Sequence, residues 1–159
     1  MAMKIELTPI GVIHSPCKEP EQAPIQAARS REMEARIEVF PDYAKGLDDL
    51  LGFECIWVIY YCHRARPWSP KVVPYMDTEQ RGVFATRSPS RPNALAISAV
   101  RLLRREGNAL VIRGVDMIDQ SPLLDLKPYI PSIDSRPECV RNGWIGKRRM
   151  DRKADDRFC

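Results

Sequence analysis

The feature that most constrains this fold is a series of short segments in which polar and apolar residues alternate, most of them ended by a proline or a glycine. Leu7–His14 is followed by Ser15-Pro16, and Ala35–Phe40 is followed by Pro41. Such alternation is typical of β-strands that bury one face. The chain has 14 prolines and 8 glycines, and proline stops strands and interrupts long helices. The pattern therefore predicts many short strands joined by fixed turns.

The central part of the chain contains the most apolar segment, Glu54–Cys62. It is rich in β-branched and aromatic residues, which predicts a strand covered on both faces. The preceding segment, Tyr43–Leu51, spaces its apolar residues as a short amphipathic helix does, and Gly52 follows as its stop. We expect this helix to serve core packing alone.

Three strands are predicted in the second half of the chain. Ala96–Arg104 carries apolar residues at alternate positions that include Ile97, and residues 104–108 read as a hairpin turn into Ala109–Val115. After residues 116–122 leave the sheet, Leu123–Tyr129 resumes the alternation. In that last strand Asp125 and Lys127 share one side, where they either pair or face a ligand.

These elements predict a mostly β fold, a small antiparallel β-barrel with one or two short helices. The βαβ alternation of a doubly wound fold is missing, and neither a G-x-G-x-x-G fingerprint nor a P-loop occurs, so we expect no Rossmann-type nucleotide site. A chain of 159 residues fits one domain. We assign residues 1–135 to the barrel and residues 136–159 to a basic C-terminal tail.

Several classes of protein are not expected. The N-terminus has no apolar core of signal-peptide length, which predicts a cytoplasmic protein. The longest apolar run, Cys55–Cys62, is far short of the ~20 residues that a membrane helix needs, so we expect no membrane span. The five cysteines form no Cys-x-x-Cys pair and the two histidines are far apart in sequence, so we expect no metal site.

Positive charge is concentrated in two places. The net charge is only +4, but residues 141–153 carry six lysines and arginines against one acid, as nucleic-acid-binding segments often do. The second place is Arg81–Asn93, which holds three arginines and two prolines. Guanidinium groups on a stiff turn suit carboxylate or phosphate. An ordinary solvated surface loop is the alternative reading of these residues.

Three separated motifs show a resemblance to a known family. They are Ile10–Pro16 (IGVIHSP), Arg81–Asn93 (RGVFATRSPSRPN) and Asp119–Tyr129 (DQSPLLDLKPY). In this order they resemble the TsaA/TrmO-like family of S-adenosylmethionine-dependent tRNA methyltransferases. The resemblance covers roughly Ile10 to Pro131. It implies a small β-barrel, S-adenosyl-L-methionine as cofactor, tRNA as partner, and a homodimer whose two subunits complete the cofactor site.

The resemblance also implies the site residues. The cofactor would contact Pro24, Ile25, Gln26, His63, Arg64, Arg87, Ile97, Asp119, Gln120, Ser121 and Pro122. Arg87 suits the carboxylate or ribose of the cofactor, and Asp119 suits an amine or hydroxyl. The substrate-binding candidates are Arg91, Asn93, Lys127 and Tyr129. The sequence identifies no general base.

The function implied is N6-methylation of threonylcarbamoyladenosine at position 37 of tRNA. Because the threonylcarbamoyl arm ends in a carboxylate, a cation is expected to bind it, and Arg91 and Lys127 are the candidates. The alternatives are a methyltransferase of this scaffold acting on another RNA or a small molecule, and a non-catalytic nucleotide- or RNA-binding module. The family usually has Asp-Gly-Thr-Pro where this chain has Asp119-Gln-Ser-Pro122, and glycine gives easy access to positive φ.

Overall fold

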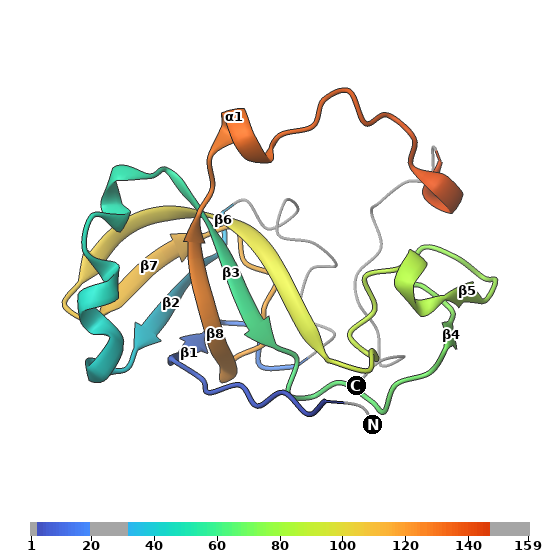
Figure 1. The fold of residues 1–159 in the computed structure, drawn as a ribbon, viewed down its shortest axis with the longest axis horizontal. Helices are drawn as coiled ribbons and strands as arrows, with labels where there is room; N and C mark the ends of the chain where they lie inside the picture. The colour runs from blue at the N-terminus through green and yellow to red at the C-terminus, as the bar shows by residue number, and fades with distance from the viewer. Residues whose placement is uncertain (1–2, 20–31, 147–159) are drawn as a thin grey trace.

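Six strands close into an antiparallel barrel in a computed structural model that describes residues 3–19 and 32–146. The order around the barrel is β1-β2-β7-β6-β3-β8, with β8 paired to β1 (Figure 1). The barrel strands are β1 (Gly11–His14), β2 (Glu34–Val39), β3 (Cys55–Tyr61), β6 (Leu95–Glu106), β7 (Ala109–Arg113) and β8 (Ser121–Pro128). The predicted fold class is confirmed.

Alternation of side chains explains why these segments form strands. In β2, Ala35, Ile37 and Val39 are buried while the residues between them face solvent, as a strand with one covered face requires. Strand β3 follows the same rule: its inner face is buried, whereas its outer face is only partly covered and Tyr61 is exposed. The prediction that this strand is covered on both faces is therefore wrong, because a closed barrel has a single interior.

Strand β6 contains the predicted strand Ala96–Arg104, and its inner face is partly polar. Ser98, Val100 and Leu102 face the interior, while Ile97 is 57% exposed on the outer face. The register against β7 shifts between Leu102 and Arg104, so a bulge changes which residues face inward. Alternation of apolar residues does not mark the inward face of this strand, because the inward position at Ser98 is polar. The hairpin turn itself is confined to Gly107 and Asn108, since Glu106 and Ala109 are paired.

The predicted amphipathic helix at Tyr43–Leu51 is replaced by two 3₁₀ segments, η3 (Pro41–Leu47) and η4 (Leu50–Gly52). Asp49 lies between them at φ 65°, a left-handed conformation that an α-helix cannot contain. Leu47 is the buried residue of η3, and Leu50 packs against the barrel core. The expected packing role is retained by a different local structure.

A small lobe lies beside the barrel (Figure 1). It is built on β4 (Lys71–Val72), β5 (Arg81–Gly82) and the 3₁₀ turn η5 (Val83–Ala85). Its core consists of Val72 and Val83, with Tyr75 packed against them. The buried Asp77 carboxylate accepts a hydrogen bond from Arg81 Nε at 2.8 Å. The lobe thus has its own apolar centre and its own buried ion pair.

The C-terminal part of the described chain returns to this lobe. After β8 the chain passes through α1 (Pro131–Asp134) and reaches η6 (Gly143–Ile145) near β5 (Figure 1). Trp144 Nε1 donates a hydrogen bond to the Ala85 carbonyl at 2.7 Å, and Arg81 Cζ lies 5.8 Å from the centre of the Trp144 ring. Trp144 therefore fastens residues 136–146 to the lobe. Residues 147–159 of the predicted basic tail lie outside the described residues.

Candidate functional site

The turn at Asp119–Ser121 is fixed to the end of β1 by four contacts. Asp119 Oδ1 accepts the Ser15 amide N–H at 2.8 Å, and Oδ2 lies 2.6 Å from Lys18 Nζ. The Asp119 amide donates to the Cys17 carbonyl and the Gln120 amide to the Ile13 carbonyl, both at 2.8 Å. Because the Ile13 carbonyl of β1 and the backbone of Ser15 and Cys17, just after β1, hold the amides and the carboxylate, this turn is positioned by the end of that strand.

The Asp119 carboxylate is kept ionised. Burial would raise its pKa, but the hydrogen bonds from Lys18, the Ser15 amide and Gln120 outweigh burial and hold the pKa below its ordinary value of 3.8. Its side chain is 13% exposed. A fixed and largely buried anion at this position can pair with an amine or a hydroxyl, as the sequence led us to expect.

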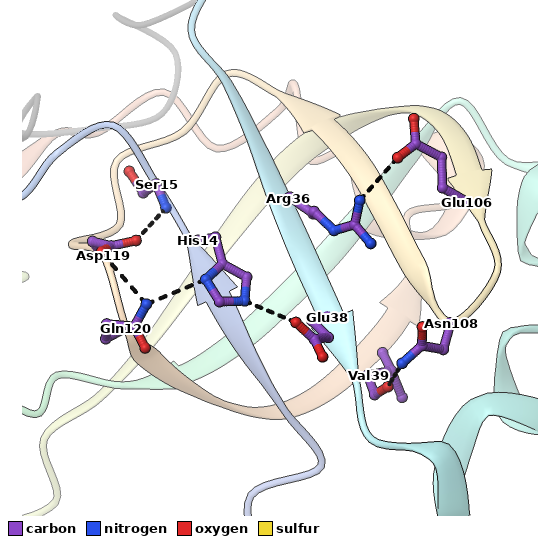
Figure 2. Close-up of polar contacts among 9 residues, drawn as sticks. All are labelled: His14, Ser15, Arg36, Glu38, Val39, Glu106, Asn108, Asp119 and Gln120. Atoms are coloured by element: carbon purple, nitrogen blue, oxygen red, sulfur yellow. Dashed lines mark hydrogen bonds and ion pairs between the residues drawn. The ribbon is translucent and has the colours of Figure 1, made fainter.

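Gln120 adopts the left-handed conformation, at φ 64°. The resembled motif has glycine at this position. In this chain Gln120 adopts this left-handed backbone conformation, which costs about 1–2 kcal/mol for a residue with a Cβ. Gln120 Nε2 contacts His14 Nδ1 at 3.2 Å, and His14 Nε2 lies 3.1 Å from Glu38 Oε2. Figure 2 shows these contacts running from the turn across β1 to β2.

His63 and Arg64 follow β3 and lie beside the Asp119 turn. His63 Nδ1 is 3.5 Å from Ser121 Oγ, the outer limit of a hydrogen bond. Arg64 donates to the Lys18 carbonyl at 2.8 Å and to Glu19 Oε2 at 2.9 Å. Loss of solvent and the charge of Arg64 lower the pKa of His63 from 6.5, with a smaller opposing effect of Asp119. The imidazole is therefore neutral at pH 7.

A largely buried polar cluster, made by Ser98, Tyr60 and Asp116, was not predicted from the sequence. Ser98 Oγ donates to Asp116 Oδ1 at 2.7 Å, and the hydroxyl of the buried Tyr60 lies close enough to both residues for them to affect its pKa. Burial, together with the charge of Asp116, raises the pKa of Tyr60 well above 10. The cluster ties the segment that leads into Asp119 to strands β3 and β6. The sequence feature that could have indicated this cluster is Ser98, a polar residue on a strand face whose other inward residues are apolar.

The two arginines predicted for the Arg81–Asn93 turn have different surroundings. Arg87 is exposed and its side chain has no hydrogen bond or ion pair within the described part of the chain. Arg91 Nη1 donates to three carbonyls of the turn, those of Val83, Thr86 and Ser88, at 3.2, 2.9 and 3.4 Å. Arg91 therefore holds the turn together, a role that the sequence did not predict.

The remaining predicted residues are not gathered at one place. Lys127 pairs with Asp125 at 2.8 Å, and the Tyr129 ring packs edge-on against Trp57 at 5.2 Å. Both lie near the start of β3, because Lys127 is in register with Trp57, whereas His63 follows the end of β3. Ile97 and Asn93 are exposed, and Pro122 pairs with Val12 of β1. Pro24, Ile25 and Gln26 lie outside the described residues.

Neither a metal-binding cluster nor a membrane-spanning helix is found among the described residues. Within residues 3–19 and 32–146, no group of three or more histidines, cysteines, aspartates and glutamates is placed to hold a metal ion. The helices of the same ranges are all too short or too polar to traverse a lipid bilayer.

The end of the barrel where β1 and β3 finish and β8 begins is thus the candidate site. Five predicted residues meet there, namely His63, Arg64, Asp119, Gln120 and Ser121. Lys18 joins them through its ion pair with Asp119 and its carbonyl contact with Arg64. Together they supply a fixed carboxylate, a neutral imidazole and two cations, a set able to bind a small charged molecule.

Comparison with known proteins gives concordant results. The family model described as tRNA-methyltransferase O N-terminal domain matches residues 12–135. A probable S-adenosyl-L-methionine-binding protein of Pyrococcus abyssi is 51% identical over 150 residues, which cover 93% of this chain and 81% of that protein. The mouse tRNA (adenine(37)-N6)-methyltransferase is 36% identical over 154 residues, 92% of this chain but 36% of that enzyme.

A solved structure agrees with the sequence matches. The crystal structure of TrmO from Pseudomonas aeruginosa superposes with a TM-score of 0.75 at 31% identity, covering 89% of this chain. The present chain spans 63% of that protein, so the two share the barrel but differ in extent. From the family model and these relatives, the chain belongs to the tRNA-methyltransferase O N-terminal domain family.

Proposed function

We propose that this protein is an S-adenosyl-L-methionine-dependent tRNA methyltransferase that methylates N6 of threonylcarbamoyladenosine at position 37. The observation that carries the proposal is the meeting of Asp119, His63, Arg64 and Lys18 at one end of a family barrel. Relatives named as S-adenosyl-L-methionine-binding proteins and as tRNA (adenine(37)-N6)-methyltransferases support it.

The residues present fit the cofactor. Its carboxylate needs a cation, and Arg87 is exposed with its donors unpaired within the described residues. Its ammonium needs an anion, which Asp119 supplies because the lowered pKa keeps that carboxylate ionised. Lys18, with a side chain 63% exposed, can give way to the ammonium. The adenine needs an apolar surface, and Ile97 offers one on the outer face of β6.

The cofactor supplies a methyl group on a positively charged sulfur, so the protein contributes binding and orientation. Because His63 is uncharged, it would add nothing to the positive charge of Arg64 and Lys18 that a bound sulfonium would meet. The Asp119 turn stays fixed because the carbonyls of Ile13 and Cys17 hold its amides.

For the threonylcarbamoyl carboxylate we propose Arg91 or Lys127 as alternative candidates. Arg91 already donates to carbonyls of its own turn, and Lys127 already pairs with Asp125. Either residue would therefore add or exchange a contact when the substrate binds.

We also infer a homodimer. The barrel interior is filled by buried side chains such as Ile37, Ile56 and Leu110, which leaves the cofactor to bind outside the barrel. The outer face of β3 and β6 exposes Tyr61, Leu95 and Ile97, and a second copy could supply the missing wall there. Light scattering should give twice 18.2 kDa. We further propose a cytoplasmic location, and a division of the chain into a barrel domain, residues 1–135, and a basic tail, residues 136–159, whose first part is fastened to the lobe through Trp144.

The test combines product analysis with a matched pair of variants. Nucleoside mass spectrometry of tRNA incubated with labelled S-adenosyl-L-methionine should find the label only when the threonylcarbamoyl group is present. Equal methylation of unmodified tRNA would contradict the substrate, and methylation of neither tRNA would favour another substrate or a binding module. Calorimetry should show Arg87→Ala binding the cofactor about ten- to a hundredfold more weakly. Arg101→Ala is the control, because Arg101 is an exposed barrel arginine that pairs with Glu54.

A further inference from the structure

An aromatic side chain stands out on the lobe. Phe84 is 77% exposed, although it lies on η5 between the buried Val83 and the Ala85 carbonyl that Trp144 holds. Its backbone is therefore fixed while its ring faces solvent. An exposed ring on a fixed turn costs the protein hydrophobic stabilisation and offers a flat surface to a partner.

A cation is fixed over this ring. Arg91 Cζ lies 5.7 Å from the centre of the Phe84 ring, within the range of a cation–π contact. Because Arg91 Nη1 also donates to carbonyls of the turn, the guanidinium is held in place before any partner binds. The ring is thus covered by a cation at one side and open over most of its surface, and little conformational entropy is lost when a second flat group stacks on it.

The lobe also differs from the barrel in charge. Residues 66–93 contain five lysines and arginines and two acids, a surplus of three positive charges. Both acids, Asp77 and Glu79, pair with Arg81, and Lys71 has no acidic partner among the described residues. By contrast, the arginines on the outside of the barrel are paired with acids: Arg36, Arg101, Arg104, Arg105 and Arg113. The lobe therefore suits a polyanion better than the barrel surface does.

We propose that Phe84 is a stacking platform for an unpaired base of the RNA substrate, with Arg91 on the ring and Lys71 on the phosphate backbone. Aromatic rings beside positive charge recognise single-stranded loops, whose bases can be splayed out and stacked, and not continuous duplexes. The inference rests on the proposed function, which makes a tRNA loop the partner. It deepens that function by naming the surface that receives the loop, distinct from the Asp119 turn.

The test is fluorescence anisotropy with a labelled tRNA anticodon stem–loop and with a fully paired duplex of the same stem. Phe84→Ala should weaken stem–loop binding about five- to a hundredfold and leave duplex binding unchanged. Phe84→Trp should restore the affinity. Leu51→Ala, which removes another exposed apolar side chain (55% exposed) on η4, should match the wild type.

Salt dependence separates stacking from charge. Phe84→Ala should keep the wild-type slope of log affinity against log salt, because it removes no charge, whereas Lys71→Ala should reduce that slope by about 0.7. The proposal is overturned if Phe84→Ala binds the stem–loop as Leu51→Ala does, or if it weakens stem–loop and duplex equally. It is also overturned if Phe84→Ala halves the mass in light scattering, since the ring would then be covered by a second copy.

Cofactor calorimetry on the same proteins distinguishes this inference from the proposed function. If the wild type binds S-adenosyl-L-methionine but not the stem–loop, the stacking platform is refuted and cofactor binding stands. If the stem–loop results are as expected but no heat of cofactor binding is found, the methyltransferase assignment fails and the RNA platform stands.

Discussion

Gly11 of β1 gives the sharpest test of how the barrel positions the Asp119 turn. A Cβ added at this residue would lie 2.1 Å from the Glu38 carbonyl oxygen, whereas real Cβ atoms essentially never approach closer than 3.0 Å, so β1 and β2 would have to separate by about 0.9 Å. Both sides of this contact are backbone within a closed barrel. No flexible side chain can move aside to accommodate Gly11→Ala.

The expected cost follows from this geometry. Forcing an extra carbon into a packed site costs about 1–3 kcal/mol, which for a chain of this size lowers Tm by about 2–12 °C. Since the carbonyls of Ile13 and Cys17 and the amide of Ser15 hold the Asp119 turn, displacement of β1 should weaken cofactor binding as well. We therefore expect Gly11→Ala to lose both stability and affinity.

Gly46 provides the matched control. An added Cβ there has no atom within 4 Å and φ is not in the left-handed region, so Gly46→Ala should be neutral or stabilise by up to about 1 kcal/mol. Urea denaturation and calorimetric Tm measure stability, and cofactor titration measures affinity. If Gly11→Ala and Gly46→Ala have the same Tm, the reasoning from the close approach of β1 and β2 is refuted.

Three further predictions concern the candidate site. Cofactor affinity should fall as pH drops through the lowered pKa of His63, below 6.5, because a protonated imidazole repels the sulfonium; pH-dependent calorimetry should show this loss in the wild type and not in His63→Gln. Asp119→Asn should be less stable than the wild type above pH 3.8, and the difference should vanish as pH falls further through the lowered folded-state pKa; a difference independent of pH would contradict an ionised Asp119. Gln120→Gly should be more stable than Gln120→Ala by about 0.5–1 kcal/mol, since both lose the His14 contact and glycine alone relieves the positive φ; equal urea midpoints would argue against strain at this turn.

Much of the fold could be predicted from local pattern. The alternation at Ala35–Phe40 marks a strand with one buried face, and the prolines and the Gly107-Asn108 turn mark where strands end. Local pattern failed where burial depends on a partner strand. Ser98 faces inward, where Asp116 accepts a hydrogen bond from its hydroxyl, and a rule that assigns polar residues to solvent cannot anticipate such a partner.

The candidate site divides in the same way. Residue types and motifs were sufficient to identify His63, Arg64, Asp119 and Ser121 as candidates, because the charge and hydrogen-bonding groups of a side chain follow from its residue type. Their spatial proximity could not be predicted from the sequence. The Asp119 turn reaches β1 only because β8 pairs with β1, at Gly11 and Leu123, and closes the barrel. The same limit hid the role of Arg91, since its partners are carbonyl oxygens and every residue has a carbonyl.

The sequence by itself determined the strands, the charges and the side chains able to bind a charged cofactor, because periodicity and ionisation are properties of nearby residues. The tertiary structure decided which of those side chains act together. Closure of the barrel brings Lys18 into an ion pair with Asp119 at one end. It leaves Lys127 near the other end, where it is in register with Trp57. Contacts between residues distant in the chain depend on the register of strand pairs, and that register is fixed by the packing of the whole barrel and not by any one segment.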